Sequence, residues 1–445
     1  MLNLFTNQLN IINKLIFPIC LIVLLIASRC LSKRPINILP LIDIEANINN
    51  MQKVYLSEFT DNIWYVPLES NPDFLLYWTY NNLSDFSENY ILYSDGKMCL
   101  LYDNEGRFIR PIGKQGRGPG EYIGIDYIAL INEKIFIHDY FTDDLLEYNI
   151  DGTFINRNKS GFTGHDKYRL RDAIMINDSM IFGNIQNYTG HEEYKALIVD
   201  KKGNIKYPYK NYIFFDLKPG VPHAQEMGEG AIFSRFGEII YFKEPFNDTL
   251  FQIDNQFRLI PFYIFNFGKY KFPLSERGKA WADIDLSSYI FLNEIFQTKN
   301  YLFVSCRLGK YFPAKRITPE IIRTPSNKDY IQWYNTQSVL GIFDERKGDI
   351  VFSEPTSTNN HLFTSGIYND IDAGPRFFPD KMVNDSTMMM KIKFDYLVEH
   401  IESNDFKYNI PKYPERKKKL EMLVDSLKKV EFDNPVYMFV TFKSK

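Results

Sequence analysis

Short stretches of alternating apolar and polar residues recur along this chain, and each is followed by a turn that runs from an aspartate to a glycine. These stretches cover Met98 to Tyr102, Leu145 to Ile150, Lys195 to Val199 and Val339 to Phe343. Alternation with a period of two is typical of β-strands, and an Asp-to-Gly turn behind a strand indicates a hairpin. The pattern therefore predicts a chain of short antiparallel strands joined by tight turns.

The turns recur at a nearly constant interval. Their aspartates are 48, 49 and 54 residues apart at Asp103, Asp151, Asp200 and Asp254, and the copy at Asp254 lacks its glycine. One four-stranded propeller blade with enlarged loops has this length. The next turn begins 90 residues later, at Asp344. This gap indicates a fifth blade that carries an insertion near residues 310–335.

Counting onward gives six blades. They are expected at Asp85 to Gly113, Ile125 to Asn158, Arg171 to Tyr209, Gly230 to Gly268, Tyr289 to Glu354, and after His361. Ring closure needs a strand from one terminus to complete a sheet begun at the other, and either Ile63 to Leu68 or Val436 to Phe442 could supply it. The predicted fold is an all-β, six-bladed β-propeller with four-stranded antiparallel blades over residues 54–445, behind a linker over residues 31–53.

One helix is expected outside the ring, near residues 414–430. Pro414 stands near its start, and the residues that share one face are Leu420, Leu423, Val424 and Leu427. Proline is favoured in the first turn of a helix, and a single apolar stripe indicates packing on one side only. We therefore expect a peripheral C-terminal helix against the outside of a blade.

Composition agrees with a β-rich fold and narrows the range of partners. The 445 residues include 30 tyrosines and 37 phenylalanines, which suit the half-buried surfaces of sheets. The formal net charge is only −3, so no nucleic-acid partner is indicated. Beyond the N-terminal region only Cys99 and Cys306 remain, and we expect two buried free thiols rather than a disulfide framework.

The N-terminus has the layout of an export signal. Leu15 to Ser28 is a nearly continuous apolar run behind Lys14, and it is shorter than the roughly 20 residues that span a bilayer as a helix. We expect a signal peptide over residues 1–30. Cys30 stands where a lipoprotein signal places its acylated cysteine, although Arg29 replaces the usual small residue. A lipid on Cys30 would hold the protein at the outer membrane, on its periplasmic or surface face, without a transmembrane helix.

In the segment Ile112 to Tyr127, four glycines (Gly113, Gly116, Gly118 and Gly120) and Pro119 stand between two strand-like runs. A phosphate-binding loop would need Gly-Lys followed by Ser or Thr and then a helix, and this segment has neither. We expect a corner between two blades, shaped by its backbone. Within it Arg117 and Glu121 are candidate ligand contacts, and stabilisation of the turn is the alternative.

Two further groups of residues are candidate contacts. Asp370, Asp372 and Arg376 surround Gly374-Pro375 and could orient a polar ligand or a calcium ion at a channel mouth, or could only bond the loop backbone. Trp281 and Trp333 flank long loops and could offer flat platforms to sugar rings, with core packing as the alternative.

Local catalytic motifs are missing from the sequence. Its six histidines are scattered without metal-binding spacing, and no Gly-x-Ser-x-Gly elbow occurs. No cofactor is predicted, and calcium or another divalent ion stays open. Side chains from several blades could still converge on a central channel, an arrangement that local spacing does not reveal.

Five parts of the chain together resemble the six-bladed β-propeller proteins, often lipoproteins, of Bacteroidales-type gut bacteria, which are distantly akin to NHL-repeat propellers. They are Val54 to Glu58 with Ile63 to Glu69, Gly116 to Tyr122, Phe246 to Leu250, Asn369 to Pro375, and Asn434 to Val436. The resemblance spans most of the mature chain and implies fold and export, but no activity. The chain departs from that family at Arg29 and at Ala373, where a second glycine is more usual.

The sequence favours an exported, lipid-anchored propeller that binds a glycan, a peptide or a protein partner at the cell envelope, because binding needs no motif that the chain lacks. A metal-dependent hydrolase or lyase centred on the channel is the alternative. A second alternative is a scaffold subunit of an envelope complex, which an exposed apolar patch would indicate.

Overall fold

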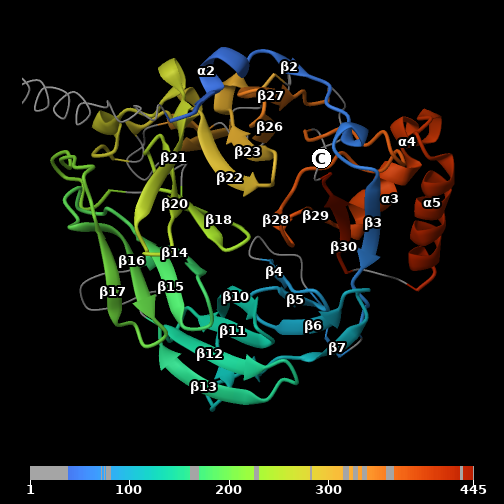
Figure 1. The fold of residues 1–445 in the computed structure, drawn as a ribbon, viewed down its shortest axis with the longest axis horizontal. Coiled ribbons are helices and arrows are strands. Elements are labelled where there is room, and N and C mark those ends of the chain that lie inside the picture. The colour runs from blue at the N-terminus through green and yellow to red at the C-terminus, as the bar shows by residue number, and fades with distance from the viewer. Residues whose placement is uncertain are drawn as a thin grey trace, which may run out of the picture. The chain divides into compact units, whose positions relative to one another are not determined.

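Six small β-sheets stand around a common axis within residues 41–445, which form one compact unit (Figure 1). The computed structural model describes residues 39–71, 73–74, 76, 82–160, 170–224, 230–280, 283–313, 320–323, 329–332, 338–356, 365–430 and 434–443. The six-bladed all-β propeller predicted from the repeat is confirmed.

The first three blades are four-stranded antiparallel sheets whose strands follow one another in chain order. Blade one consists of β4 (Leu83–Phe86), β5 (Tyr90–Ser94), β6 (Cys99–Asp103) and β7 (Phe108–Pro111). Blade two consists of β10 (Ile125–Ile131), β11 (Lys134–Asp139), β12 (Asp144–Asn149) and β13 (Phe154–Lys159). Blade three consists of β14 (Leu170–Met175), β15 (Met180–Ile185), β16 (Tyr194–Asp200) and β17 (Ile205–Lys210). Because side chains alternate between the two faces of a sheet, each sheet can pack against both neighbours. Leu101 of blade one and Ile137 of blade two thus belong to one buried cluster.

Blades four and five each carry a fifth strand. The antiparallel strands of blade four are β18 (Ile232–Phe236), β19 (Ile239–Lys243), β20 (Thr249–Ile253) and β21 (Leu259–Asn266). Those of blade five are β22 (Phe291–Gln297), β23 (Tyr301–Arg307), β26 (Ser338–Asp344) and β27 (Asp349–Ser353). β1 (Leu41–Asp43) pairs in parallel with β21, and β2 (Met51–Gln52) pairs in parallel with β27. The segment that the sequence presented as a linker therefore contributes two edge strands from residue 41 onward.

Burial explains why this segment joins the blades. Ile42 and Ile44 are fully buried and Ile48 nearly so, and all three pack in the cluster between blades four and five. The short helix α2 (Ile44–Asn47) joins the two strands, and Asp43 caps it by accepting a hydrogen bond from the N–H of Ala46. Each added strand also covers backbone groups at a sheet edge.

The insertion expected in blade five lies between β23 and β26. Two strands are described within it, β24 (Glu320–Arg323) and β25 (Asp329–Gln332), and they form a separate antiparallel pair. Single turns of 3₁₀-helix occur at Leu56–Glu58, Gly268–Tyr270, Leu274–Glu276, Leu286–Ser288 and Gly309–Tyr311.

Blade six is assembled from both ends of the chain. Its strand order is β28 (Lys381–Met382), β29 (Thr387–Ile392), β30 (Val436–Thr441) and β3 (Asn62–Pro67). Both strands that the sequence offered for ring closure are therefore used, side by side. Trp64 stands opposite Phe439 in this pairing, and the two rings stack with centroids 5.1 Å apart.

Three helices are inserted between β29 and β30 and lie outside blade six (Figure 1). They are α3 (Phe394–Glu402), α4 (Asn404–Tyr408) and α5 (Pro414–Lys428). The expected helix is α5, and it buries Leu420 and Val424 against the core of blade six. None of the helices in the described part of the chain is long and apolar enough to cross a membrane.

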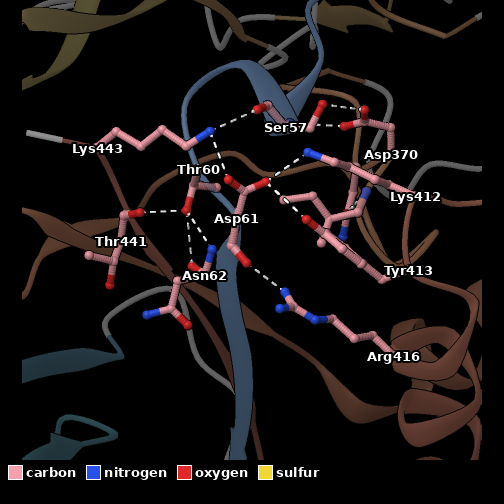
Figure 2. Close-up of polar contacts among 12 residues, drawn as sticks. Ser57, Thr60, Asp61, Asn62, Asp370, Lys412, Tyr413, Arg416, Thr441 and Lys443 are labelled. Atoms are coloured by element: carbon pink, nitrogen blue, oxygen red, sulfur yellow. Dashed lines mark hydrogen bonds and ion pairs between the residues drawn. The ribbon is translucent and has the colours of Figure 1, made fainter. Parts of the chain in front are cut away.

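A polar network reinforces the ring closure at the start of β3 (Figure 2). The carboxylate of Asp61 pairs with Lys412 at 2.8 Å and with Lys443 at 2.9 Å. Hydrogen bonds from these two ammonium groups hold the pKa of Asp61 well below its usual range. The backbone carbonyl of Asp61 accepts a hydrogen bond from Arg416, and the hydroxyl of Thr60 donates to the carbonyl of Thr441. The network thus joins the start of β3 to α5 and to the last strand.

The outer hairpins explain the Asp-to-Gly repeat. In blades one, three and four a single oxygen of the turn aspartate accepts two backbone N–H groups, at Asp103, Asp200 and Asp254. Three residues later the backbone is left-handed, with φ of +81° at Gly106 and +79° at Gly203. Phe257 has φ of +58° at the same place in blade four, so the turn survives where the glycine is lost.

Candidate functional site

A cavity of about 400 Å³ lies at the axis of the propeller. Its walls come from the first strands of the blades, β4, β10, β14, β18 and β22, and from residues 380–385, which include β28. These strands surround the centre of the ring (Figure 1). Every blade therefore contributes to the cavity, whose volume is in the range of small-molecule binding sites.

Two carboxyl groups of this cavity stand out because they lack partners. Glu294 lies on β22 directly behind a β-bulge, at which the register shifts between Leu292 and Glu294. A bulge re-aims the side chains that follow it. No hydrogen bond or ion pair joins the Glu294 carboxyl to the rest of the described chain. One oxygen of Asp380 accepts the N–H of Lys391 at 2.6 Å, and its other oxygen has no partner among the described residues.

The surroundings shift the pKa of both groups upward. Enclosure by protein, and then the neighbouring charge of Asp380, raise the pKa of Glu294 to about 7, against the opposing effect of Lys381. Enclosure likewise raises the pKa of Asp380 to about 6, although the N–H and the charge of Lys391 oppose it. Both side chains are still reached by water-sized molecules, because the cavity is hollow. Two acids with pKa values near neutrality in one cavity are typical of a functional site.

The two basic side chains of the wall are occupied. The ammonium of Lys381 pairs with Asp85 at 2.8 Å and donates to the carbonyl of Ser84 at 2.6 Å. The guanidinium of Arg235 donates to two backbone carbonyls, those of Met175 and Ile176. Both cations of the wall thus have partners in the protein, whereas the Glu294 carboxyl has none among the described residues.

The glycine corner is confirmed as the connection between blades one and two. Glu121 accepts the N–H of Gly118 at 2.7 Å and pairs with Lys114 at 3.2 Å, and these contacts lower the pKa of its carboxyl. Arg117 is exposed on the same corner. Gly113 and Gly120 have φ of +63° and +68°, so two of the four glycines use the left-handed backbone that the loop was expected to need.

Asp370, Asp372 and Arg376, the second group of candidates, form hydrogen bonds within the protein. Asp370 accepts the N–H and the hydroxyl of Ser57, as Figure 2 shows. Asp372 is buried and accepts the N–H of Gly374 at 2.8 Å. Arg376 donates to the carbonyl of Glu354 at 2.7 Å. Apart from the bond to the Ser57 hydroxyl, these are backbone contacts of the kind that the sequence gave as the alternative to ligand binding.

The structure does not bring the two groups of candidates to the axial cavity. Arg117, Glu121, Asp370, Asp372 and Arg376 are all absent from its walls. Their role in ligand binding remains a prediction. Trp281, Trp333 and Cys30 lie outside the described residues, as does the whole signal segment.

A resident metal ion has no evident site in the part of the chain that the structure describes. There, no group of three or more His, Cys, Asp or Glu side chains is arranged to hold one. Both described cysteines, Cys99 and Cys306, are buried free thiols, as predicted.

Sequence reasoning missed Glu294 and Asp380. They are 86 residues apart and belong to different blades, so no local spacing links them. The local signal is a polar pair, Asn293-Glu294, between apolar residues of strand β22. The inner strands β4, β10 and β18 also carry a charged residue each, so this interruption does not single out the position.

Comparisons with known proteins agree with the fold. The family model described as "Domain of unknown function (DUF4934)" matches residues 39–441. No protein with a curated description matches the chain.

Solved structures match this chain at low sequence identity. A Bacteroides fragilis protein described as a "putative exported protein" is 15% identical, with a TM-score of 0.58 over 91% of this chain and 99% of that one. A DUF4221 family member from Bacteroides vulgatus is 13% identical, with a TM-score of 0.47 over 86% and 97%. A virginiamycin B lyase from Staphylococcus aureus is 10% identical, with a TM-score of 0.34 over 65% and 87%. The similarity to the B. fragilis protein supports the fold and nothing finer.

Proposed function

Because this chain belongs to the family described as a domain of unknown function (DUF4934), we propose its function from its own site: an exported binding propeller that takes its ligand in the axial cavity. The ligand is a glycan, a peptide or an exposed segment of an envelope protein. One observation carries the proposal, namely a cavity walled by all six blades in which two carboxyl groups have unused acceptor oxygens. Water reaches both side chains through the cavity, so a ligand that enters it meets these oxygens as ready hydrogen-bond acceptors that can fix its orientation.

Ligand screening on matched variants tests this proposal. Purified protein, the double variant Glu294→Gln/Asp380→Asn and a control, Asp425→Asn, are screened by thermal shift against glycans and peptides. Asp425 is an exposed carboxylate on α5, outside the ring. We expect one ligand class to raise the melting temperature of the protein and of the control but not of the double variant. A ligand that stabilises all three equally, or no response to any class, would contradict the proposal.

Export to the cell envelope is part of the proposal. It rests on the apolar run Leu15 to Ser28 and is supported by the structural similarity to a Bacteroides fragilis protein whose name refers to export. We further propose that Cys30 carries the lipid that attaches the protein to the outer membrane. Fractionation of cells that make the protein or its Cys30→Ser variant tests this. The protein should enter the membrane fraction and the variant the soluble one; equal distributions would contradict lipidation.

A second candidate function is catalysis in the same cavity, as a hydrolase or a lyase. The specific observation in its favour is the raised pKa of Glu294, about 7, because an acid that titrates near neutrality can both donate and accept a proton. Product analysis of any stabilising glycan or peptide distinguishes the two functions. Turnover that is lost in Glu294→Gln, and that a chelator removes if a metal takes part, would establish catalysis. A ligand that is recovered unchanged would support binding without catalysis.

A further inference from the structure

We infer, on the basis of the binding function proposed above, that the group received by the axial cavity is a primary ammonium. The ligand would thus carry an aliphatic amine, as an amino sugar or a lysine side chain does. The inference rests on which polar atoms of the wall are free and which are engaged.

The free carboxylate oxygens of the wall are hydrogen-bond acceptors. The Glu294 carboxyl has no hydrogen bond to the described chain, and one oxygen of Asp380 is likewise free. The hydroxyl of Ser234, a residue that is only 7% exposed, lines the same cavity, has no hydrogen-bond partner among the described residues, and can accept as well as donate. An ammonium group has three N–H donors and no acceptor. It therefore complements these groups without leaving an acceptor of its own unsatisfied.

The engaged groups support the same choice. Lys381 and Arg235 are the basic residues of the wall, and acceptors of the protein already occupy both. The wall carries four carboxyl groups, those of Asp85, Glu294, Asp380 and Asp385, against these two cations. A ligand carboxylate or phosphate would therefore meet a wall with an excess of acidic groups, and an anionic ligand is the poorer fit.

A divalent cation is a poorer match than an ammonium group. Calcium takes six to eight oxygen ligands in most proteins, and the described residues offer no group of three or more candidate ligands. A cavity of about 400 Å³ also has room for much more than one ion. A sugar residue or an extended side chain would fill it, with its amine at Glu294.

Proton release is a measurable consequence. The surroundings raise the pKa of each carboxyl group toward neutrality, and a cation bound beside these groups favours their charged forms. Binding at pH 7 should therefore release protons to the buffer. The heat of binding should then differ between two buffers of different ionisation enthalpy, and affinity should fall when the pH is lowered from 7 to 5.

Calorimetry with paired probes tests the inference. Glucosamine is compared with N-acetylglucosamine, and a short lysine-containing peptide with the same peptide acetylated on its lysine. Acetylation removes the positive charge of the amine and leaves most of the shape of the probe unchanged. We expect the free amine of at least one pair to bind at least about 10-fold more tightly than its acetylated form, since hydrogen bonds to charged groups are worth roughly 1.5–3 kcal/mol. The pair that responds identifies the source of the amine, sugar or peptide.

Variants locate the binding. Glu294→Gln and Asp380→Asn should each weaken the amine at least about 10-fold, whereas the exposed Asp425→Asn should change nothing. An acetylated probe that binds as tightly as its amine, and that still depends on Glu294, would overturn the ammonium inference and leave the binding function intact. If no probe binds, and glycans and peptides in general fail to stabilise the protein, then the binding function falls as well.

Discussion

The backbone N–H of Gly237 donates a hydrogen bond of 2.6 Å to the carboxylate of Asp385. Gly237 belongs to the hairpin between β18 and β19 in blade four, whereas Asp385 belongs to the hairpin between β28 and β29 in blade six. The two hairpins meet although blade five separates their blades in the ring. Asp385 also lines the axial cavity, so this contact spans one side of the cavity wall.

Removing this contact should loosen the hairpin of blade four without unfolding the protein. In Asp385→Ala we expect faster amide hydrogen exchange at residues 236–239 and a loss of global stability below about 1 kcal/mol, because the bond is exposed to solvent. Exchange measured by mass spectrometry checks this. Asp385→Asn keeps an acceptor oxygen and should lie between the two proteins. Unchanged exchange in Asp385→Ala would show that the hairpin is held by other contacts.

Gly106 should be intolerant of any side chain. Its φ is +81°, and an added Cβ would lie 2.2 Å from the carbonyl oxygen of Pro67, which belongs to β3 at the closure of the ring. Strained backbone and steric overlap together predict a loss of about 2–4 kcal/mol for Gly106→Ala. Urea unfolding measures it.

Gly348 provides the matched control for this substitution. Its φ is +72°, and nothing lies within 4 Å of an added Cβ. Gly348→Ala should therefore lower the free energy of unfolding only through backbone strain, by about 1 kcal/mol. Equal losses in the two variants would mean that the close approach of Gly106 to Pro67 has no energetic weight.

His138 should make the stability of blade two depend on pH. The imidazole is fully buried between Asp126, at 2.5 Å, and Asp143, at 3.2 Å. Burial alone would lower the pKa of His138, but the two carboxylates outweigh it and raise the pKa above its usual 6.5. The stabilisation from the charged imidazole is thus complete below pH 6.5 and is lost as the pH rises through the higher pKa of the folded state.

Unfolding measured between pH 6 and pH 9 checks this dependence. The unmodified protein should lose stability over the range, and Asp126→Asn, which removes one partner of the imidazole, should lose less. Parallel curves for the two proteins would exclude His138 as the source of the dependence.

Glu294 should reduce stability at alkaline pH. Its pKa rises from 4.5 to about 7 on folding, so the folded state binds the proton more tightly and stability falls as the pH rises from 4.5 through 7. Glu294→Gln should be more stable than the unmodified protein at pH 8, by an amount on the order of 1 kcal/mol after allowance for solvent screening. At pH 4 the two should be alike. A variant that is less stable at pH 8 would show that the carboxylate has a stabilising partner.

The outer hairpins could be read from the sequence because their physics is local. In blade one, Asp103 bonds the backbone two and four residues onward, and Gly106 supplies the left-handed residue of the same turn. All the groups that decide the conformation stand within five residues. The number of blades followed from the spacing of these turns.

The axial site and the added strands could not be read in this way. Glu294 and Asp380 come together only because the ring brings β22 and β28 to one axis. Leu41 of β1 pairs with Ile264, a partner that no short-range pattern singles out. Pairing over such distances depends on which sheet edges the finished ring leaves open, and that is a property of the assembled fold.

Blade six gives the chain an order of events. Its outer strand β3 leaves the ribosome among the first elements, whereas its neighbour β30 is the last strand of the fold to be made. Until β30 is available, Asn62–Pro67 has no partner and the ring stands open at one blade. Closure of the propeller is therefore a late event of synthesis, and a chain that lacks β30 is left with two unpaired strand edges, those of β3 and β29.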